Sequence, residues 1–84
     1  MRIVWDDHKR LANIDKHDGV DLAEVTEEYL NEAKLFPAKF GRVAAVGPHK
    51  GHLMTAIVEP LGTEAVAVIS FRVASRKERR DYWS

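Results

Sequence analysis

The sequence predicts an α+β fold: a small antiparallel β-sheet with helices packed on one face, in the order β-α-α-β-β-β-α. Residues 6–34 place apolar side chains at helical spacing between capping residues. Residues 35–73 are instead divided by Pro and Gly into short segments rich in Val, Ile and Ala. The connections between these segments are short enough for hairpins, which favours antiparallel pairing. With 84 residues, we expect a single domain over residues 1–84.

The first predicted elements are an extended segment at residues 2–5 and a helix of about ten residues. Asp6 is the expected N-cap, and Gly19 ends the helix because glycine readily adopts positive φ. Leu11 and Ile14 lie three residues apart on the face that we expect to be buried. The opposite face holds polar side chains, namely Lys9, Arg10, Asn13, Lys16 and His17.

A second helix is predicted from Asp21 to Lys34, since Asp21 and Glu24 have the spacing of a capping box. Its expected buried stripe consists of Leu22, Val25, Tyr29 and Ala33. The second half of the chain then contains three predicted strands, at residues 42–46, 53–59 and 64–73. Ser75 and Glu78 form a clear capping box, which predicts a final helix over residues 76–83.

Length and composition exclude several classes of protein. The chain is too short for a doubly wound dehydrogenase or a TIM barrel. It contains no cysteine, which excludes disulfides and cysteine-bearing zinc sites and suits a reducing cytosol. Its histidines lack the spacing of a metal motif, and His49 and His52 are assigned to a hairpin loop without nearby carboxylates, so no metal site is expected. No segment has the length or apolar character of a membrane span or signal peptide, and the expected location is the cytoplasm.

The charges balance overall but are unevenly distributed. Residues 6–34 carry a net charge of −5, whereas residues 71–84 carry +3. A concentrated basic end suggests an anionic partner, and nucleic acid is the first candidate. The alternative is an ordinary solvated helix end, because cations complement the C-terminus of a helix.

Arg72 lies at the end of the last predicted strand. Simple alternation places Val66, Val68, Ser70 and Arg72 on one face, and Ile69 and Phe71 in the core on the other face. An arginine on a strand is rigidly placed, and its planar fork suits phosphate oxygens. The alternative is an arginine paired with a neighbouring carboxylate.

The final helix places Arg76, Arg79, Arg80 and Trp83 within about 100° of arc. A nucleobase can stack on the indole while the guanidinium groups bind phosphates. The same stripe can dock an acidic partner protein, or Trp83 can simply pack on the sheet. Near the end of the first helix, His17 follows Lys16, and histidine is the usual proton-transfer side chain near pH 7. A capping role for this histidine is the alternative.

Distinctive motifs stand at both ends of the chain. The first is Trp5-Asp6-Asp7-x-Lys9-Arg10 followed by Asn13-Ile14-x-Lys16-His17 and Gly19-Val20. The last is Ile69-Ser70-Phe71-Arg72-x-Ala74-x-Arg76-x-Glu78-Arg79-Arg80-x-Tyr82. These motifs, together with Arg42 and Gly47 between them, resemble the BrnT family of toxins, and the resemblance runs from Trp5 to Tyr82. Many relatives carry an arginine where this chain has Ala67.

The resemblance implies a toxin of a bacterial type II toxin–antitoxin system with a RelE-like fold. Such toxins cleave RNA without a metal or other cofactor. A BrnA-type ribbon-helix-helix antitoxin neutralises the toxin, and the complex binds operator DNA through the antitoxin. The expected catalytic residues are Arg72, Arg79, Arg80 and His17. The expected RNA-binding residues are Lys16, Arg42, Arg76, Lys77 and Trp83, and the expected antitoxin-binding residues are Arg76, Arg79 and Arg80. The alternative function is a non-catalytic module that docks an acidic partner through its basic C-terminal helix.

Overall fold

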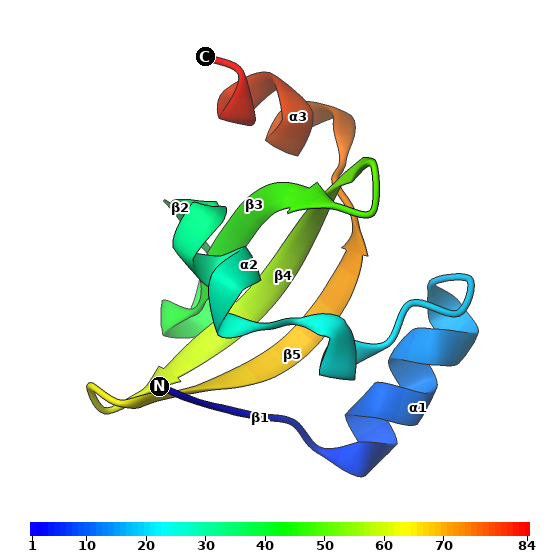
Figure 1. The fold of residues 1–84 in the computed structure, drawn as a ribbon, viewed down its shortest axis with the longest axis vertical. Coiled ribbons are helices and arrows are strands. Elements are labelled where there is room, and N and C mark those ends of the chain that lie inside the picture. The colour runs from blue at the N-terminus through cyan, green and yellow to red at the C-terminus, as the bar shows by residue number, and fades with distance from the viewer.

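The computed structural model describes residues 1–84 and contains a five-stranded sheet with three α-helices (Figure 1). The elements are β1 (Arg2–Val4), α1 (Asp7–Lys16), α2 (Glu27–Glu32), β2 (Lys34–Pro37), β3 (Val43–His49), β4 (His52–Leu61), β5 (Ala65–Val73) and α3 (Arg76–Tyr82). A short 3₁₀ turn occupies Leu22–Glu24, and a tight turn with left-handed backbone at Phe40 and Gly41 occupies Lys39–Gly41. The strand order is β1-β5-β4-β3-β2. The α+β class is confirmed, but the chain has one strand more than the sequence predicts.

The extra strand, β2, pairs antiparallel with β3. At the opposite edge, β1 pairs with β5 in parallel, so the prediction of a purely antiparallel sheet is wrong there. The direction of β1 follows from the helix after it. Asn13 of α1 binds Phe71 further along the same edge of β5, and the chain must therefore advance in the direction of β5. No helix in the structure combines the length and the apolar composition that crossing a lipid bilayer requires.

The predicted second helix is broken into two pieces. The Asp21 carboxylate accepts a hydrogen bond from the Ala23 backbone N–H and therefore caps only a 3₁₀ turn. The same carboxylate also accepts hydrogen bonds from Nε and Nη2 of Arg10, both at 2.8 Å. Thr26 starts α2 instead, because its hydroxyl accepts from the Tyr29 backbone N–H. Leu22, Val25 and Tyr29 are nonetheless buried as predicted.

Glu24 does not complete the predicted capping box with Asp21. Its carboxylate binds His49 Nε2 at 2.9 Å and Lys50 Nζ at 2.8 Å. The prediction that no carboxylate lies near His49 is therefore wrong. His49 ends β3 and pairs with His52 across a two-residue turn, in which Lys50 and Gly51 both have positive φ.

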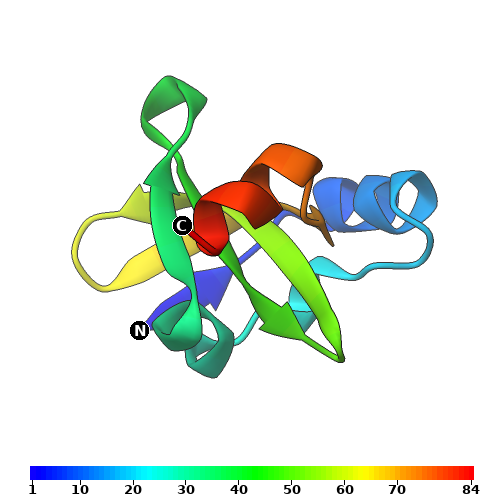
Figure 2. The same cartoon turned by 90° about the horizontal axis from the view of Figure 1, so that it is seen from above.

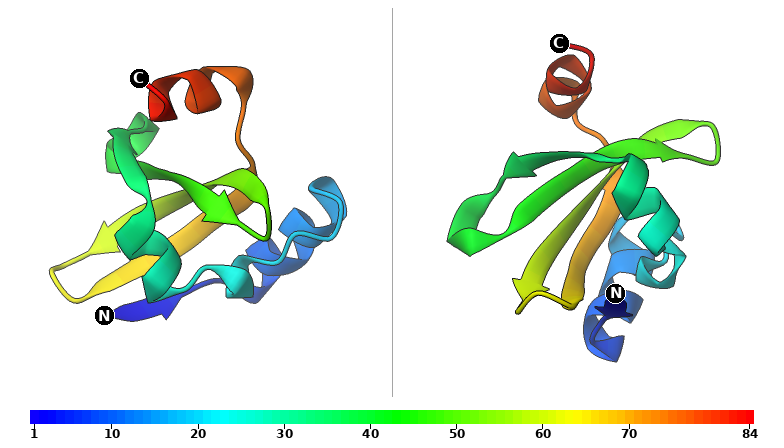
Figure 3. Two further views of the ribbon diagram at one scale, coloured as in Figure 1. Left: turned by 45° about the horizontal axis from the view of Figure 1, so that its top comes forward. Right: turned by 60° about the vertical axis from the view of Figure 1, so that its left-hand side comes forward.

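The main core lies between one face of the sheet and the segment that includes α2 (Figure 3). It consists of Leu22, Val25, Tyr29, Ala45, Met54, Ala56, Val58, Val68 and Phe71. Helix α3 contacts the other face of the sheet, because Glu78 binds Thr55 and Arg72. The residues that precede these two, Met54 and Phe71, face the core, and successive residues of a strand point to opposite faces. The prediction that all helices pack on one face is therefore wrong for α3.

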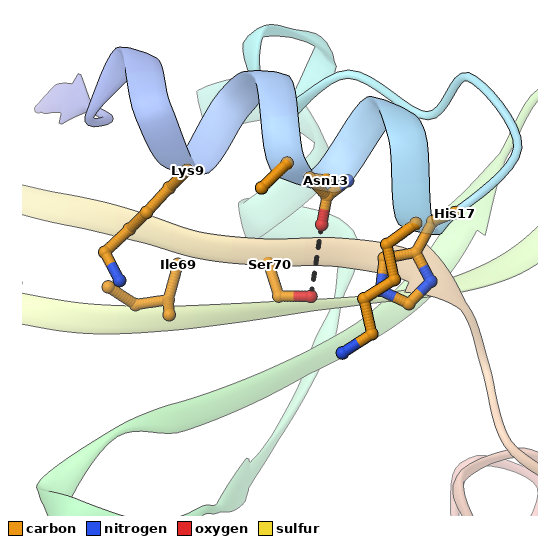
Figure 4. A pocket seen from close by; sticks show the side chains of 7 residues that line it. Lys9, Asn13, His17, Ile69 and Ser70 are labelled. Carbon is orange, nitrogen blue, oxygen red and sulfur yellow. Dashed lines mark hydrogen bonds between the residues drawn. The ribbon is translucent and has the colours of Figure 1, made fainter.

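A β-bulge interrupts the alternation of β5. Ile57 pairs with Ser70 and Val58 pairs with Val68, which leaves Ile69 without a partner. Val68 and Phe71 therefore both face the core, although simple alternation separates them. The sequence correctly placed Phe71 inside and Arg72 on the opposite face, but it wrongly placed Val68 beside Arg72 and Ile69 in the core. The consequence is that Ile69 and Ser70 both line a cavity beside α1 (Figure 4).

Candidate functional site

Asn13 fastens α1 to the edge of β5. Its amide donates to the carbonyl oxygens of Phe71 at 2.8 Å and Val20 at 2.9 Å, and its oxygen accepts from the Phe71 backbone N–H at 3.2 Å. Strand β1 has already ended at the level of Ala67, so this side chain replaces a strand as partner for the β5 backbone.

The sequence assigned Asn13 to solvent and Leu11 to the core, and both assignments are wrong, whereas Ile14 is half-buried and Lys9 and Lys16 are exposed. Asn13 is only 6% exposed, whereas Leu11 is 59% exposed. The reason is that α1 packs beside a strand edge, where polar backbone groups need hydrogen-bond partners, and not over an apolar sheet face.

A shallow cavity of about 180 Å³ opens between this face of α1 and β5 (Figure 4). Its lining residues are Lys9, Ala12, Asn13, Lys16, His17, Ile69 and Ser70. The Ser70 hydroxyl donates to Asn13 Oδ1 at 3.3 Å. Two ammonium groups and an imidazole around a small polar cavity suit an anion such as a phosphate.

His17 is the C-cap of α1, and its backbone N–H donates to the Asn13 carbonyl oxygen. Burial lowers the pKa of His17, and the positive charges of Lys16 and Arg72 lower this pKa further. The imidazole is therefore mostly neutral near pH 7 and able to accept a proton. Of the residues that the sequence singled out for function, Lys16 and His17 line this cavity, whereas Arg72 does not.

Arg72 forms a bidentate ion pair with Glu78. The distances are 2.6 Å from Nη1 to Oε1 and 2.9 Å from Nη2 to Oε2. The alternative that Arg72 pairs with a carboxylate is therefore confirmed. The pair occupies two of the five guanidinium N–H donors, which leaves the others for a substrate while the group is held in place.

Glu78 collects several further hydrogen bonds. Its carboxylate accepts from the Thr55 hydroxyl and the Ser75 backbone N–H, both at 2.8 Å, and this completes the predicted capping box. Burial raises the pKa of Glu78, but the hydrogen bonds from Arg72, Ser75 and Thr55 outweigh burial and lower this pKa to about 2. The carboxylate is a fixed anion that orients Arg72 and anchors α3 to the sheet.

We expect replacement of Glu78 by glutamine to lower the melting temperature in a pH-dependent way. The folded-state pKa of about 2 lies below the ordinary 4.5, so the stabilisation is fully present above about 4.5 and is lost as pH falls toward 2. The melting temperatures of E78Q and wild type should differ most near pH 7 and converge near pH 2. Thermal melts across this range check it, with K77Q, which removes an exposed ion pair to Asp81, as control. A difference that stays constant with pH would contradict the assignment.

Two of the other four basic residues of α3 make contacts within the protein and two do not. Arg79 donates to the Ala74 carbonyl oxygen at 3.1 Å, and Lys77 pairs with Asp81 at 2.8 Å. The side chains of Arg76 and Arg80 are exposed and make no hydrogen bond or ion pair. Trp83 is 76% exposed, with its ring edge-on to Tyr82.

Arg42 does not join the cluster around His17. It lies at the start of β3 and pairs with Glu59 at 3.4 Å. Glu59 is four residues beyond Thr55 on β4, which corresponds to about 13 Å along the strand. Sequence reasoning also missed Lys9, Asn13 and Ser70 as members of the site. No three or more His, Asp or Glu side chains lie together in an arrangement that could hold a metal ion.

The structure is similar to the crystal structure of the Brucella abortus ribonuclease toxin BrnT, with a TM-score of 0.81 and 43% sequence identity. The match covers 90% of this chain and 99% of that chain. No protein-family model and no curated protein matches the chain. Identity at this level, over nearly the whole of the Brucella protein and in the same α+β arrangement, agrees with the motifs at both ends of the sequence. The chain therefore belongs to the BrnT family.

Proposed function

We propose that this protein is the toxin of a type II toxin–antitoxin system and acts as an endoribonuclease. The observation that carries the proposal is the 43% identity to a ribonuclease toxin across nearly the whole chain. The cationic cavity beside α1 supports it, because RNA cleavage needs groups that bind a phosphate and move a proton. In this proposal, residues 1–84 form one domain with a RelE-like fold, and the protein acts in the cytoplasm.

The proposed reaction needs no metal, because RNA supplies its own nucleophile. The 2′-hydroxyl oxygen attacks the adjacent phosphorus while its proton passes to a base. The bond from phosphorus to the 5′-oxygen breaks, and that oxygen takes up a proton. The products are a 2′,3′-cyclic phosphate and a 5′-hydroxyl. The protein must orient the hydroxyl, transfer the protons and stabilise the charge on the phosphorane.

The site residues divide this work in the proposal. Neutral His17 receives the 2′-hydroxyl proton, which its lowered pKa allows near pH 7. Lys16 faces the developing charge from the wall of the cavity. Arg72, which is held by Glu78 and does not line the cavity, contributes a second positive charge. Arg79 and Arg80 bind the same or the next phosphate. Further along the RNA, the cationic side chains of Arg42, Arg76 and Lys77 bind phosphates, and a base stacks on Trp83.

The deciding experiment uses the purified protein, free of any antitoxin, with RNA in the presence of EDTA. We expect cleavage fragments that end in a cyclic phosphate. If the RNA stays intact while an acidic partner binds tightly, the protein is the non-catalytic docking module instead. Gel analysis of end-labelled RNA and a binding titration on the same preparation separate the two functions.

We expect His17→Ala to slow RNA cleavage about 10²- to 10⁴-fold, the usual contribution of a general base. In wild type, log kcat/KM should rise with pH and level off above the His17 pKa, which burial places below its ordinary 6.5. The variant should lose this inflection. H8Q, which alters an exposed histidine on the same helix, is the matched control. An unchanged pH profile in H17A would assign the base to another group.

A BrnA-type ribbon-helix-helix antitoxin is the proposed partner, and the complex is proposed to repress its own operon by binding operator DNA through the antitoxin. We propose that the antitoxin covers α3, where Arg76, Arg79 and Arg80 are exposed. Covering these arginines blocks access of RNA phosphates, so neutralisation needs no change in the fold of the toxin.

A further inference from the structure

The connection between β2 and β3 presents a strained and exposed aromatic ring. In Figure 2 this connection projects beyond the rest of the sheet. Phe40 has φ 61° and ψ 33°, and the residue is 85% exposed. The left-handed region disfavours large side chains, and water disfavours an exposed apolar ring. The positive φ belongs to a two-residue turn, as at Lys50, but the turn does not account for the exposed ring.

The ring is not needed to hold the connection together. The Ala38 backbone N–H donates to the Arg42 carbonyl oxygen at 3.0 Å, and the Arg42 backbone N–H donates to the Lys39 carbonyl oxygen at 3.2 Å. The backbone therefore closes the turn by itself. Glycine at position 40 would adopt the observed φ without strain, so a structural role gives no reason for phenylalanine.

A guanidinium group lies over the ring, and a second cationic residue adjoins it in the sequence. The Arg42 guanidinium lies over the Phe40 ring, with Cζ 5.9 Å from the centroid, and its Nε is held by Glu59 at 3.4 Å. Lys39 precedes the ring and is also exposed. An exposed aromatic face beside a guanidinium and an ammonium group is the combination that binds single-stranded nucleic acid, because bases stack while cations contact phosphates.

We propose that Phe40 is a nucleobase-stacking residue that holds a nucleotide some distance along the RNA from the one cleaved, with Arg42 beside it on a phosphate. The inference rests on the proposed ribonuclease function and adds a specific RNA contact to it. RNA is favoured over a protein partner because the exposed ring has a guanidinium over its face, and the two together suit a base and a phosphate. The ring lies beyond the start of β3 and the His17 cavity lies beside β5, with β4 between these strands, so the two contacts take different nucleotides of one strand.

The test measures RNA binding by Phe40→Gly and Phe40→Trp. The probe is a 2′-O-methylated oligonucleotide, which lacks the nucleophile and stays intact, and fluorescence anisotropy gives the Kd. We expect F40G to weaken binding about 5- to 150-fold, the range that one stacked base contributes. F40W should bind at least as tightly as wild type. F40G should melt at or above the wild-type temperature, because glycine relieves the positive φ. L11A, which trims an exposed apolar side chain on α1, should bind like wild type.

The outcomes separate this inference from the function on which it rests. If wild type cleaves RNA and F40G binds the probe equally well, the stacking role is overturned and the ribonuclease stands. If wild type neither binds nor cleaves RNA, both the stacking role of Phe40 and the ribonuclease function are rejected. If F40G keeps its RNA affinity but loses antitoxin binding or self-association, the ring docks protein and the stacking role is overturned.

Discussion

Replacing Arg79 and Arg80 together by alanine should abolish growth arrest in cells that produce the protein without antitoxin. Both side chains are exposed, so the free energy of unfolding should change by only about 0.5 kcal/mol. RNA binding should also become less salt-sensitive, because each lost phosphate contact lowers the slope of log K against log salt by about 0.7 for a single strand. Lysine at both positions should restore activity only in part, since it lacks the planar fork of arginine.

The matched control is a double variant with Arg2→Ala and Lys50→Ala, which removes the same amount of charge from exposed side chains outside the proposed site. Lys50→Ala also removes the ion pair with Glu24, and an exposed pair of this kind contributes only about 0–1 kcal/mol to stability. Colony counts after induction, together with the amount of soluble protein and its melting temperature, give the comparison. If R79A/R80A melts like wild type and still arrests growth, these arginines have no part in toxicity.

Asn13→Asp should be the most damaging single change to the fold. A carboxylate cannot donate to the Val20 and Phe71 carbonyl oxygens, which would be left unpaired beside a buried charge. Each unpaired buried group costs about 1–3 kcal/mol, so we expect a loss of about 3–5 kcal/mol. For a domain of this size, that loss corresponds to a fall in melting temperature of more than about 12 °C.

The pH dependence of this variant provides an internal check. Burial should raise the pKa of the new carboxyl, and a protonated carboxyl can donate one hydrogen bond. The deficit relative to wild type should therefore shrink as pH falls toward 4. N31D, which introduces the same group at an exposed position on α2, should change the melting temperature little. Equal stability of N13D and N31D would show that Asn13 does not hold α1 to the sheet.

The parts of the fold that the sequence predicts well are those decided by neighbouring residues. Asp6 begins α1, and Ser75 with Glu78 begins α3, because caps act within one helical turn. The failures involve distant partners. The edge strand β2 is short and ends in proline, so it has no local signal, and the parallel pairing of β1 depends on residues at the other end of the chain.

The candidate site was predictable in its residue types but not in its geometry. His17 and Arg72 were singled out because of their chemistry. The structure places His17 on the wall of the cavity beside α1, whereas Arg72 is held by Glu78 and does not line that cavity. The polar face of α1 was also visible in the sequence. It was assigned to solvent because nothing local indicates a strand edge that needs Asn13. Likewise, the capping role of Glu78 gave no sign that the same carboxylate would also hold Arg72 and Thr55.

The parallel pairing of β1 with β5 affects the order in which the fold can be completed during synthesis. The ribosome makes β1 and α1 first, yet their partners on β5 follow much later in the chain, and Asn13 and Phe71 are 58 residues apart. Contacts between such distant segments form late, because a long loop must close before they can be made. Asn13 therefore cannot hold α1 in place, and the cavity beside His17 cannot form, until β5 has been made. Chains that terminate before β5 lack the assembled cavity, and the activity proposed for it cannot appear in them.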